Sequence, residues 1–234
     1  MRQIAPQVYI MDGLPVSNVY LLASAAGLTL VDTGLAGGVG SLVAQLEASG
    51  YQLPDVRTIV LTHAHGDHTG GLPALVARSG AQVWAYRDEV PYVEGAQALP
   101  ASFWPMRLMG WLGSRGAKKK PSLKVSRALA DGETVDVLGG MQVIHTPGHT
   151  PGSLCLYQPE QKILFCGDIL SQKRQPDGAA GLDYAPAAFS ADSAQARETV
   201  RRLANLPVEV LCPGHGKPVL HGAGEMIRKL LEKG

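Results

Sequence analysis

The six residues His63 to His68 read HAHGDH and follow a short apolar run. Four of these six side chains can bind a metal ion, and three of the chain's seven histidines are among them. A single histidine is usually a core or surface residue. Histidines at this density, with an aspartate between them, instead indicate a metal site, because imidazole and carboxylate are common ligands of divalent ions.

Backbone geometry divides this run into two pairs. A buried strand is predicted directly before it, and in a strand alternate side chains share a face, so His63 and His65 point the same way and can bind one ion. Gly66 then lets the backbone turn, which leaves Asp67 and His68 for a second ion. Four ligands do not complete two sites, because zinc usually takes four ligands and a catalytic site keeps one position for water.

Three later motifs offer the missing ligands. His149 lies in TPGHTPG, Asp168 ends CGD, and His215 lies in CPGHG. Each lies where a predicted strand gives way to a glycine-rich loop, a common position for site residues. With the first run they supply five histidines and two aspartates, enough for two metal centres that share one carboxylate.

In this order, and preceded by Val31-Asp32-Thr33-Gly34, the motifs resemble those of the metallo-β-lactamase superfamily over residues 31–216. The resemblance implies an α/β fold, a four-layer αββα sandwich with the metals at the rim between its two sheets. It implies a first metal held by His63, His65 and His149. It implies a second metal held by Asp67, His68 and His215, with Asp168 bridging the two. Asp32 and Thr62 would support the ligands without binding metal.

Differences from known branches of this family narrow the range of activities to be expected. β-Lactamases of the family lack an aspartate at the position of Asp168, and flavodiiron proteins have glutamate where this chain has His65. Glyoxalase II shares the motifs, and Lys173 and Arg174 could contact its anionic substrate. Acyl-homoserine lactonases carry a tyrosine where this chain has Ser171. Persulfide dioxygenases keep the same ligands but use one iron.

The resemblance therefore implies a metallo-hydrolase. Two divalent ions about 3.5–4 Å apart can lower the pKa of a bridging water and polarise a carbonyl. The resulting hydroxide, oriented by Asp67, would attack an ester, thioester or lactone. Zinc is expected, and iron or manganese suits the same ligands. The open alternatives are a mononuclear iron oxidoreductase of the persulfide dioxygenase type and a lactonase or phosphoesterase variant. A binding protein without turnover is disfavoured by the intact ligand set.

Strands and helices alternate around these motifs. Hydrophobic periodicity and turn residues predict strands at 7–11, 18–23, 28–32, 57–61, 81–86, 134–138, 141–146, 153–158, 162–166 and 208–211. Helices are predicted at 41–49, 72–78, 193–205 and 224–233, the third capped by Asp192 or Ser190. Residues 172–183 read as a polar loop.

Residues 91–130 are predicted to form a helical insertion between core elements. This segment holds Trp104 and Met106, which would either pack on their own domain or form a lid or wall over the site. Tyr184 is a further candidate for the pocket. An apolar part of the substrate is therefore expected.

Length, composition, charge and cysteine count exclude several classes of protein. The 234 residues, of which 45% are hydrophobic and 18% charged, suit a single globular domain spanning 1–234. A formal net charge of +1 gives no case for nucleic acid or an anionic membrane surface. No signal peptide or membrane-spanning segment is recognised. Three cysteines make a poor disulfide framework, so a cytoplasmic protein with a small-molecule substrate is expected, and a homodimer stays open.

Overall fold

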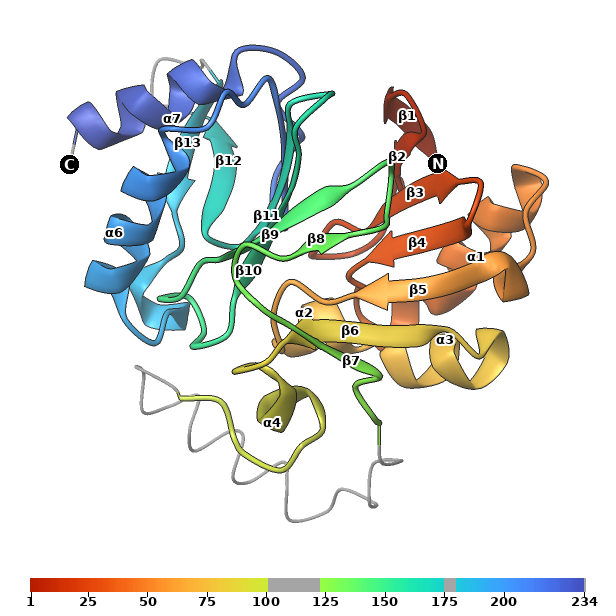
Figure 1. The fold of residues 1–234 in the computed structure, drawn as a ribbon. Helices are drawn as coiled ribbons and strands as arrows, with labels where there is room; N and C mark the ends of the chain where they lie inside the picture. The colour runs from red at the N-terminus through yellow and green to blue at the C-terminus, as the bar shows by residue number, and fades with distance from the viewer. Residues whose placement is uncertain (101–122, 175–179, 234) are drawn as a thin grey trace.

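The computed structural model describes residues 1–100, 123–174 and 180–233, whose strands form two facing sheets and a separate ribbon (Figure 1). The first sheet has seven strands in chain order: β1 (Arg2–Ala5), β2 (Val8–Ile10), β3 (Tyr20–Ser24), β4 (Gly27–Val31), β5 (Val56–Val60), β6 (Gln82–Tyr86) and β7 (Arg127–Leu129). The second has the order β14 (Val210–Pro213), β11 (Ile163–Gly167), β10 (Leu154–Gln158), β9 (Met141–His145) and β8 (Thr134–Val135).

Alternating side chains on these strands produce the layers. In β10, Leu154 and Leu156 pack between the two sheets, whereas Cys155 and Tyr157 face the helices behind the second sheet. Strand β11 alternates in the same way. A strand that is apolar on both faces must be covered on both faces, so each sheet lies between the other sheet and a layer of helices.

Helices cover the outer face of each sheet (Figure 1). Helices α1 (Val39–Ala48) and α3 (Leu72–Ser79) pack on the first sheet, and α6 (Ser193–Leu203) and α7 (Ala223–Glu232) on the second. Shorter elements are α2 (Gly66–Thr69), α4 (Val90–Val93), η1 (Ala36–Gly38), η2 (Leu53–Asp55) and η3 (Ala187–Phe189). The predicted αββα sandwich is confirmed. Within the described ranges, no helix combines the length and apolar character needed to cross a membrane.

Two sequence predictions need correction. The polar loop predicted at 172–183 is largely a ribbon, in which β12 (Leu170–Arg174) pairs antiparallel with β13 (Ala180–Tyr184). The pattern concealed it because the ribbon is short and largely polar, and it pairs with neither sheet. The insertion predicted at 91–130 ends in β7, an edge strand of the first sheet, and its residues 101–122, with Trp104 and Met106, lie outside the described ranges.

Helix α6 begins at the cap that the sequence indicates. The Asp192 side chain accepts a hydrogen bond from the Gln195 backbone N–H at 2.9 Å. We expect Asp192→Ala to lower the free energy of unfolding by about 1 kcal/mol, because this N–H loses its acceptor. Urea denaturation measures the change. Glu198→Ala in the same helix removes only an exposed ion pair with Arg201 and should cost under about 0.5 kcal/mol. Equal losses in the two variants would contradict the capping role.

Candidate metal centre

The HAHGDH segment links strand β5 to helix α2. Strand β5 ends at Val60, so His63 and His65 lie beyond the paired part of the strand that was expected to orient them. Their rings nevertheless lie 4.8 Å apart between centroids. The turn into α2 also needs no special glycine conformation, because Gly66 does not have a positive φ and a Cβ there would meet open space.

Four side chains form a first group of ligand atoms: His63, His65, His149 and Asp168. The Nε2 atom of His149 is 2.9 Å from Nδ1 of His65 and 3.2 Å from Nε2 of His63. One ligand atom from each side chain lies within 4.8 Å of the others. This arrangement gives three imidazole nitrogens and one carboxylate oxygen around a common point.

Asp67, His68 and His215 form a second group. The Nε2 atom of His215 is 3.3 Å from Oδ2 of Asp67 and 3.4 Å from Nε2 of His68. The structure thus brings all seven sequence-predicted ligands together, in the same two sets.

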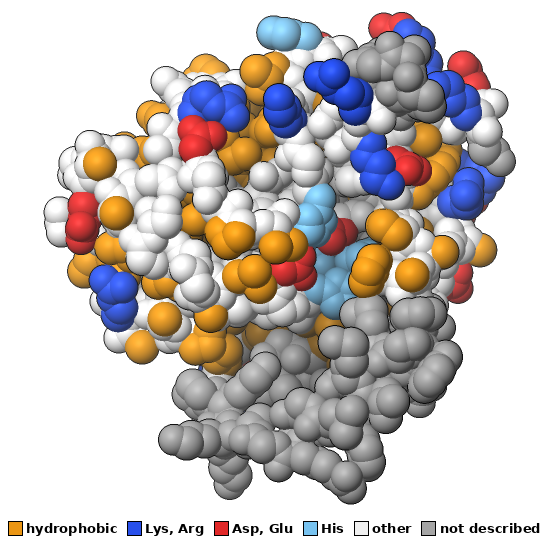
Figure 2. Space-filling model, turned by 180° about the vertical axis from the view of Figure 1, so that it is seen from behind, with side chains coloured by type: hydrophobic (Ala, Val, Ile, Leu, Met, Phe, Trp, Pro, Cys, Tyr) orange, Lys and Arg blue, Asp and Glu red, His pale blue; other side chains and the backbone are white. Residues whose placement is uncertain are grey.

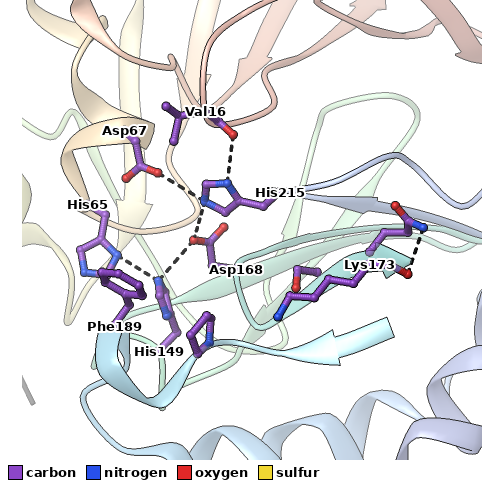
Figure 3. A pocket seen from close by; sticks show the side chains of 11 residues that line it. Val16, His65, Asp67, His149, Asp168, Lys173, Phe189 and His215 are labelled. Atoms are coloured by element: carbon purple, nitrogen blue, oxygen red, sulfur yellow. Dashed lines mark hydrogen bonds and ion pairs between the residues drawn. The ribbon is translucent and has the colours of Figure 1, made fainter. Parts of the chain in front are cut away.

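Asp168, directly after β11, lies between the two groups (Figure 3). Its Oδ2 atom is 3.5 Å from Nε2 of His149 in the first group and 3.0 Å from Nε2 of His215 in the second. Its Oδ1 atom is 3.3 Å from Nε2 of His68, yet it is buried without a hydrogen-bond partner among the described residues. A buried carboxylate oxygen without a partner is costly, and a bound cation would satisfy it.

The donor set also fits divalent ions electrostatically. Burial lowers the pKa of His63 well below its usual value and that of His149 to about 4, so both imidazoles are neutral with a lone pair available. Burial lowers the pKa of His68 too, but the carboxylates of Asp168 and Asp32 outweigh it and raise that pKa. The hydrogen bond to Asp168 contributes most to raising the pKa of His215 to about 10. The carboxylates therefore favour positive charge at this point, as a cation would supply.

Asp32 and Thr62 orient two of the imidazoles. Asp32 Oδ2 accepts hydrogen bonds from His68 Nδ1 at 2.8 Å and from the Thr62 hydroxyl at 2.7 Å, and Oδ1 accepts from the Thr62 backbone N–H at 2.8 Å. Because the Thr62 hydroxyl donates to Asp32, it accepts from Nδ1 of His63, 3.0 Å away. Both rings therefore carry their proton on Nδ1 and present Nε2 to the centre.

A strained turn at residues 15–17 supports the second group, and the sequence did not indicate it. The Ser17 backbone N–H donates to the Pro15 carbonyl at 3.0 Å, and Val16 between them has φ +71°. This is the rarer, strained form of a three-residue turn, and it is unfavourable for a β-branched residue. The Val16 carbonyl accepts from Nδ1 of His215 at 3.0 Å, and the Ser17 hydroxyl donates to the Asp67 carbonyl.

A cavity of about 480 Å³ opens beside the ligands (Figure 3). It is lined by Val16, Pro186 and Phe189, by Ser171, Gln172 and Lys173 of β12, and by His65, Asp67, His149, Asp168 and His215. Figure 2 shows the histidine and carboxylate side chains in a hollow of this face, with hydrophobic side chains beside them. The hollow thus combines ligand atoms with apolar walls.

Among the described residues, the apolar walls come from side chains that the sequence did not indicate. Val16 and Phe189 are 65% and 51% exposed, and sequence reasoning missed both, because a turn residue and a single 3₁₀ turn give no periodic signal. Tyr184 is not among the described residues that line the cavity. Its ring instead lies 4.5 Å from the Arg197 guanidinium carbon. Lys173 lines the cavity and forms an ion pair with Asp183 at 2.9 Å.

Comparison with known proteins gives consistent matches. The family model described as the metallo-beta-lactamase superfamily matches residues 12–215. The chain is 30% identical over 230 residues to the probable metallo-hydrolase YflN of Bacillus subtilis, covering 87% of this chain and 82% of that protein. It is 30% identical over 216 residues to an acyl-coenzyme A thioesterase of Gallus gallus, covering 85% and 72% respectively. It is 32% identical over 204 residues to a hydroxyacylglutathione hydrolase of Pseudomonas aeruginosa, covering 84% and 61%.

A solved structure shows the same fold. A metallo-beta-lactamase family protein of Thermus thermophilus superposes with a TM-score of 0.71 at 26% identity, covering 99% of this chain and 80% of that one. The similarity therefore extends over both sheets and their helices, and not only over the motifs.

Two glycines near the ligands should differ in how substitution by alanine affects the bound metal. A Cβ at Gly214 would lie 2.1 Å from Oδ1 of Asp168 and 2.7 Å from Cε1 of His68, whereas one at Gly66 meets nothing within 4 Å. We expect Gly214→Ala to lose most of its bound zinc and Gly66→Ala to keep it, although Gly66 lies inside the motif. Elemental analysis after reconstitution with Zn²⁺ measures this, with circular dichroism as the folding control. Equal zinc content in the two variants would refute the tight packing at Gly214.

Proposed function

Because the chain belongs to the metallo-beta-lactamase superfamily and is a hydrolase, we propose that it uses two divalent metal ions, zinc in the first instance, to hydrolyse an acyl ester, thioester or lactone. The observation that carries this proposal is the placement of Asp168, whose carboxylate contacts both groups of ligands. If only the first group held an ion, Asp67, His68 and His215 would converge on a point that contains no ion.

The proposal assigns His63, His65 and His149 to one ion, Asp67, His68 and His215 to the other, and Asp168 to both. When bound, such a pair of ions lowers the pKa of water toward neutrality and polarises a carbonyl oxygen. Asp67 lines the cavity, so its second carboxylate oxygen can orient the attacking water. Asp32 and Thr62 act indirectly, by keeping the proton of His63 and His68 on Nδ1.

The cavity supports a substrate with an apolar acyl part. Val16, Pro186 and Phe189 offer an apolar wall next to the ligands, while Lys173 offers a cation on the ribbon. One relative at 30% identity is named an acyl-coenzyme A thioesterase, which favours a thioester among the three carbonyl classes. A thiolate is also a good leaving group, so the chain needs to supply no proton donor to it.

Replacing Asp168 tests the dinuclear hydrolase. We expect wild type to bind two zinc ions per chain, and Asp168→Ala to lose metal and to fall by roughly 100-fold or more in kcat/KM, because the shared ligand is gone. Elemental analysis and a panel of acyl thioesters, esters and lactones measure both. Asp131→Ala, at an exposed ion pair with Arg202, is the control. Retained hydrolysis in Asp168→Ala, or oxygen uptake on a persulfide with one bound iron in wild type, would refute the proposal.

Shortening the apolar wall tests the substrate class. We expect Phe189→Ala and Val16→Ala to raise KM for long acyl chains more than for acetyl thioesters, by roughly 5- to 30-fold, since about 1–2 kcal/mol of apolar burial is lost. Steady-state kinetics across acyl lengths measures the change. Leu220→Ala, another exposed apolar residue that does not line the cavity, serves as the control. If KM changed equally for all acyl-chain lengths, the two residues would contribute only to packing and not to acyl-chain binding.

A further inference from the structure

Glu89 is a buried carboxylate that lies outside both groups of ligands. It follows β6 at the start of α4 and has 0% of its surface exposed. A carboxylate without solvent is unfavourable unless hydrogen bonds replace the lost water. Its partners therefore show what the residue holds in place.

Among the described residues, the donors to Glu89 come from the two loops that carry the first group of ligands. Oε1 accepts from the Ala64 backbone N–H at 2.7 Å, and Ala64 lies between His63 and His65. Oε2 accepts from the Thr150 hydroxyl at 3.0 Å and from the Gly152 backbone N–H at 2.8 Å, and Thr150 directly follows His149.

Close packing supports the same connection independently. A Cβ at Gly152 would lie 2.3 Å from the Glu89 backbone nitrogen, so the TPGHTPG loop rests directly against the start of α4. Ser153 completes the loop, because its hydroxyl accepts from the Thr150 N–H at 3.0 Å and lies 2.7 Å from the Thr150 hydroxyl. With the Thr150 proton directed to Glu89, Ser153 donates to Thr150. Every polar group in this contact is thus matched.

We propose that Glu89 is a positioning residue that sets the spacing of His63, His65 and His149 and so determines affinity for the first metal ion. The inference rests on the proposed dinuclear function. The second group is supported by other residues, because Asp32 holds His68, Val16 holds His215 and Ser17 holds the Asp67 backbone. Loss of Glu89 should therefore weaken one metal site far more than the other.

Glu89→Gln tests this with little change in volume. In either orientation the new amide N–H₂ faces at least one backbone N–H, of Ala64 or of Gly152, so one loop loses its anchor. We expect the Kd of the first site for Co²⁺ to rise about 10- to 100-fold, as for other residues that orient metal ligands, with the second site changed less than about 3-fold. Titration of the metal-free protein with Co²⁺ measures both affinities. Paramagnetically shifted imidazole N–H signals identify the sites, three from the first group and two from the second.

Two matched sets of variants serve as controls. Glu94→Gln alters another carboxylate that bridges chain segments, because Glu94 Oε1 accepts a hydrogen bond of 3.0 Å from the Val125 backbone N–H. This contact does not involve the ligand loops, so both metal affinities should stay unchanged. Thr150→Val removes one donor to Glu89 and should weaken the first site, whereas Thr150→Ser restores the hydroxyl and the affinity. This pair decides the question if Glu89→Gln does not fold.

The outcomes separate this inference from the proposed function. Unchanged affinity of the first site in folded Glu89→Gln, or equal weakening of both sites with a lower melting temperature of the metal-free protein, would overturn the role of Glu89. A wild-type protein that binds one ion through three imidazoles, with that ion lost in Glu89→Gln, would support Glu89 and contradict the dinuclear proposal. A wild-type protein that binds no Co²⁺ would overturn both.

Discussion

A histidine that binds a metal has two ring nitrogens, and only one of them can face the ion. The other must find an acceptor, or a buried N–H is left unsatisfied. The chain meets this requirement separately for four imidazoles. The acceptors are Asp32 for His68, Thr62 for His63, the Val16 carbonyl for His215 and, at a longer 3.4 Å, the Ser190 hydroxyl for His149. Much of the surrounding structure serves to position these four acceptors beside the imidazole rings.

The two sheets bring the ligands and their supporting residues together because parallel strands end at a common edge. Strands β4, β5 and β6 are parallel neighbours, and Asp32, the HAHGDH segment and Glu89 follow their respective carboxyl ends. In the second sheet β11 and β14 are also parallel, and Asp168 and His215 follow them. Backbone hydrogen bonds then connect the loops, from Leu154 N to Thr62 O at 3.0 Å and from Gly214 N to Gly167 O at 2.7 Å. The site is thus fixed by the edges of both sheets.

The two groups of candidate ligands could be predicted from the sequence because metal binding requires particular residue types at close spacing. The supports could not, because they act through tertiary contacts. Glu89 is a single acidic residue whose partners lie 25 to 63 positions away, and no spacing rule connects them. Strand alternation predicts the pairing of His63 and His65, although both residues lie beyond the end of β5. The β12–β13 ribbon escaped detection because periodicity reports burial against a sheet, and this ribbon pairs with neither sheet.

Backbone strain near the ligands follows from the same requirement. Asp32 has φ +62° and Val16 has φ +71°, a region that residues other than glycine rarely adopt. Such conformations cost of order 1–3 kcal/mol each and persist only where neighbouring contacts enforce them. Asp32 is enforced by its bonds to Thr62 and His68, and Val16 by the bonds of its carbonyl and of Ser17. In both cases the strained residue supplies the acceptor of a ligand imidazole, so relaxing the backbone would turn that acceptor away from the ring. At these two positions the positive φ thus accompanies the acceptor that keeps a histidine's proton on Nδ1.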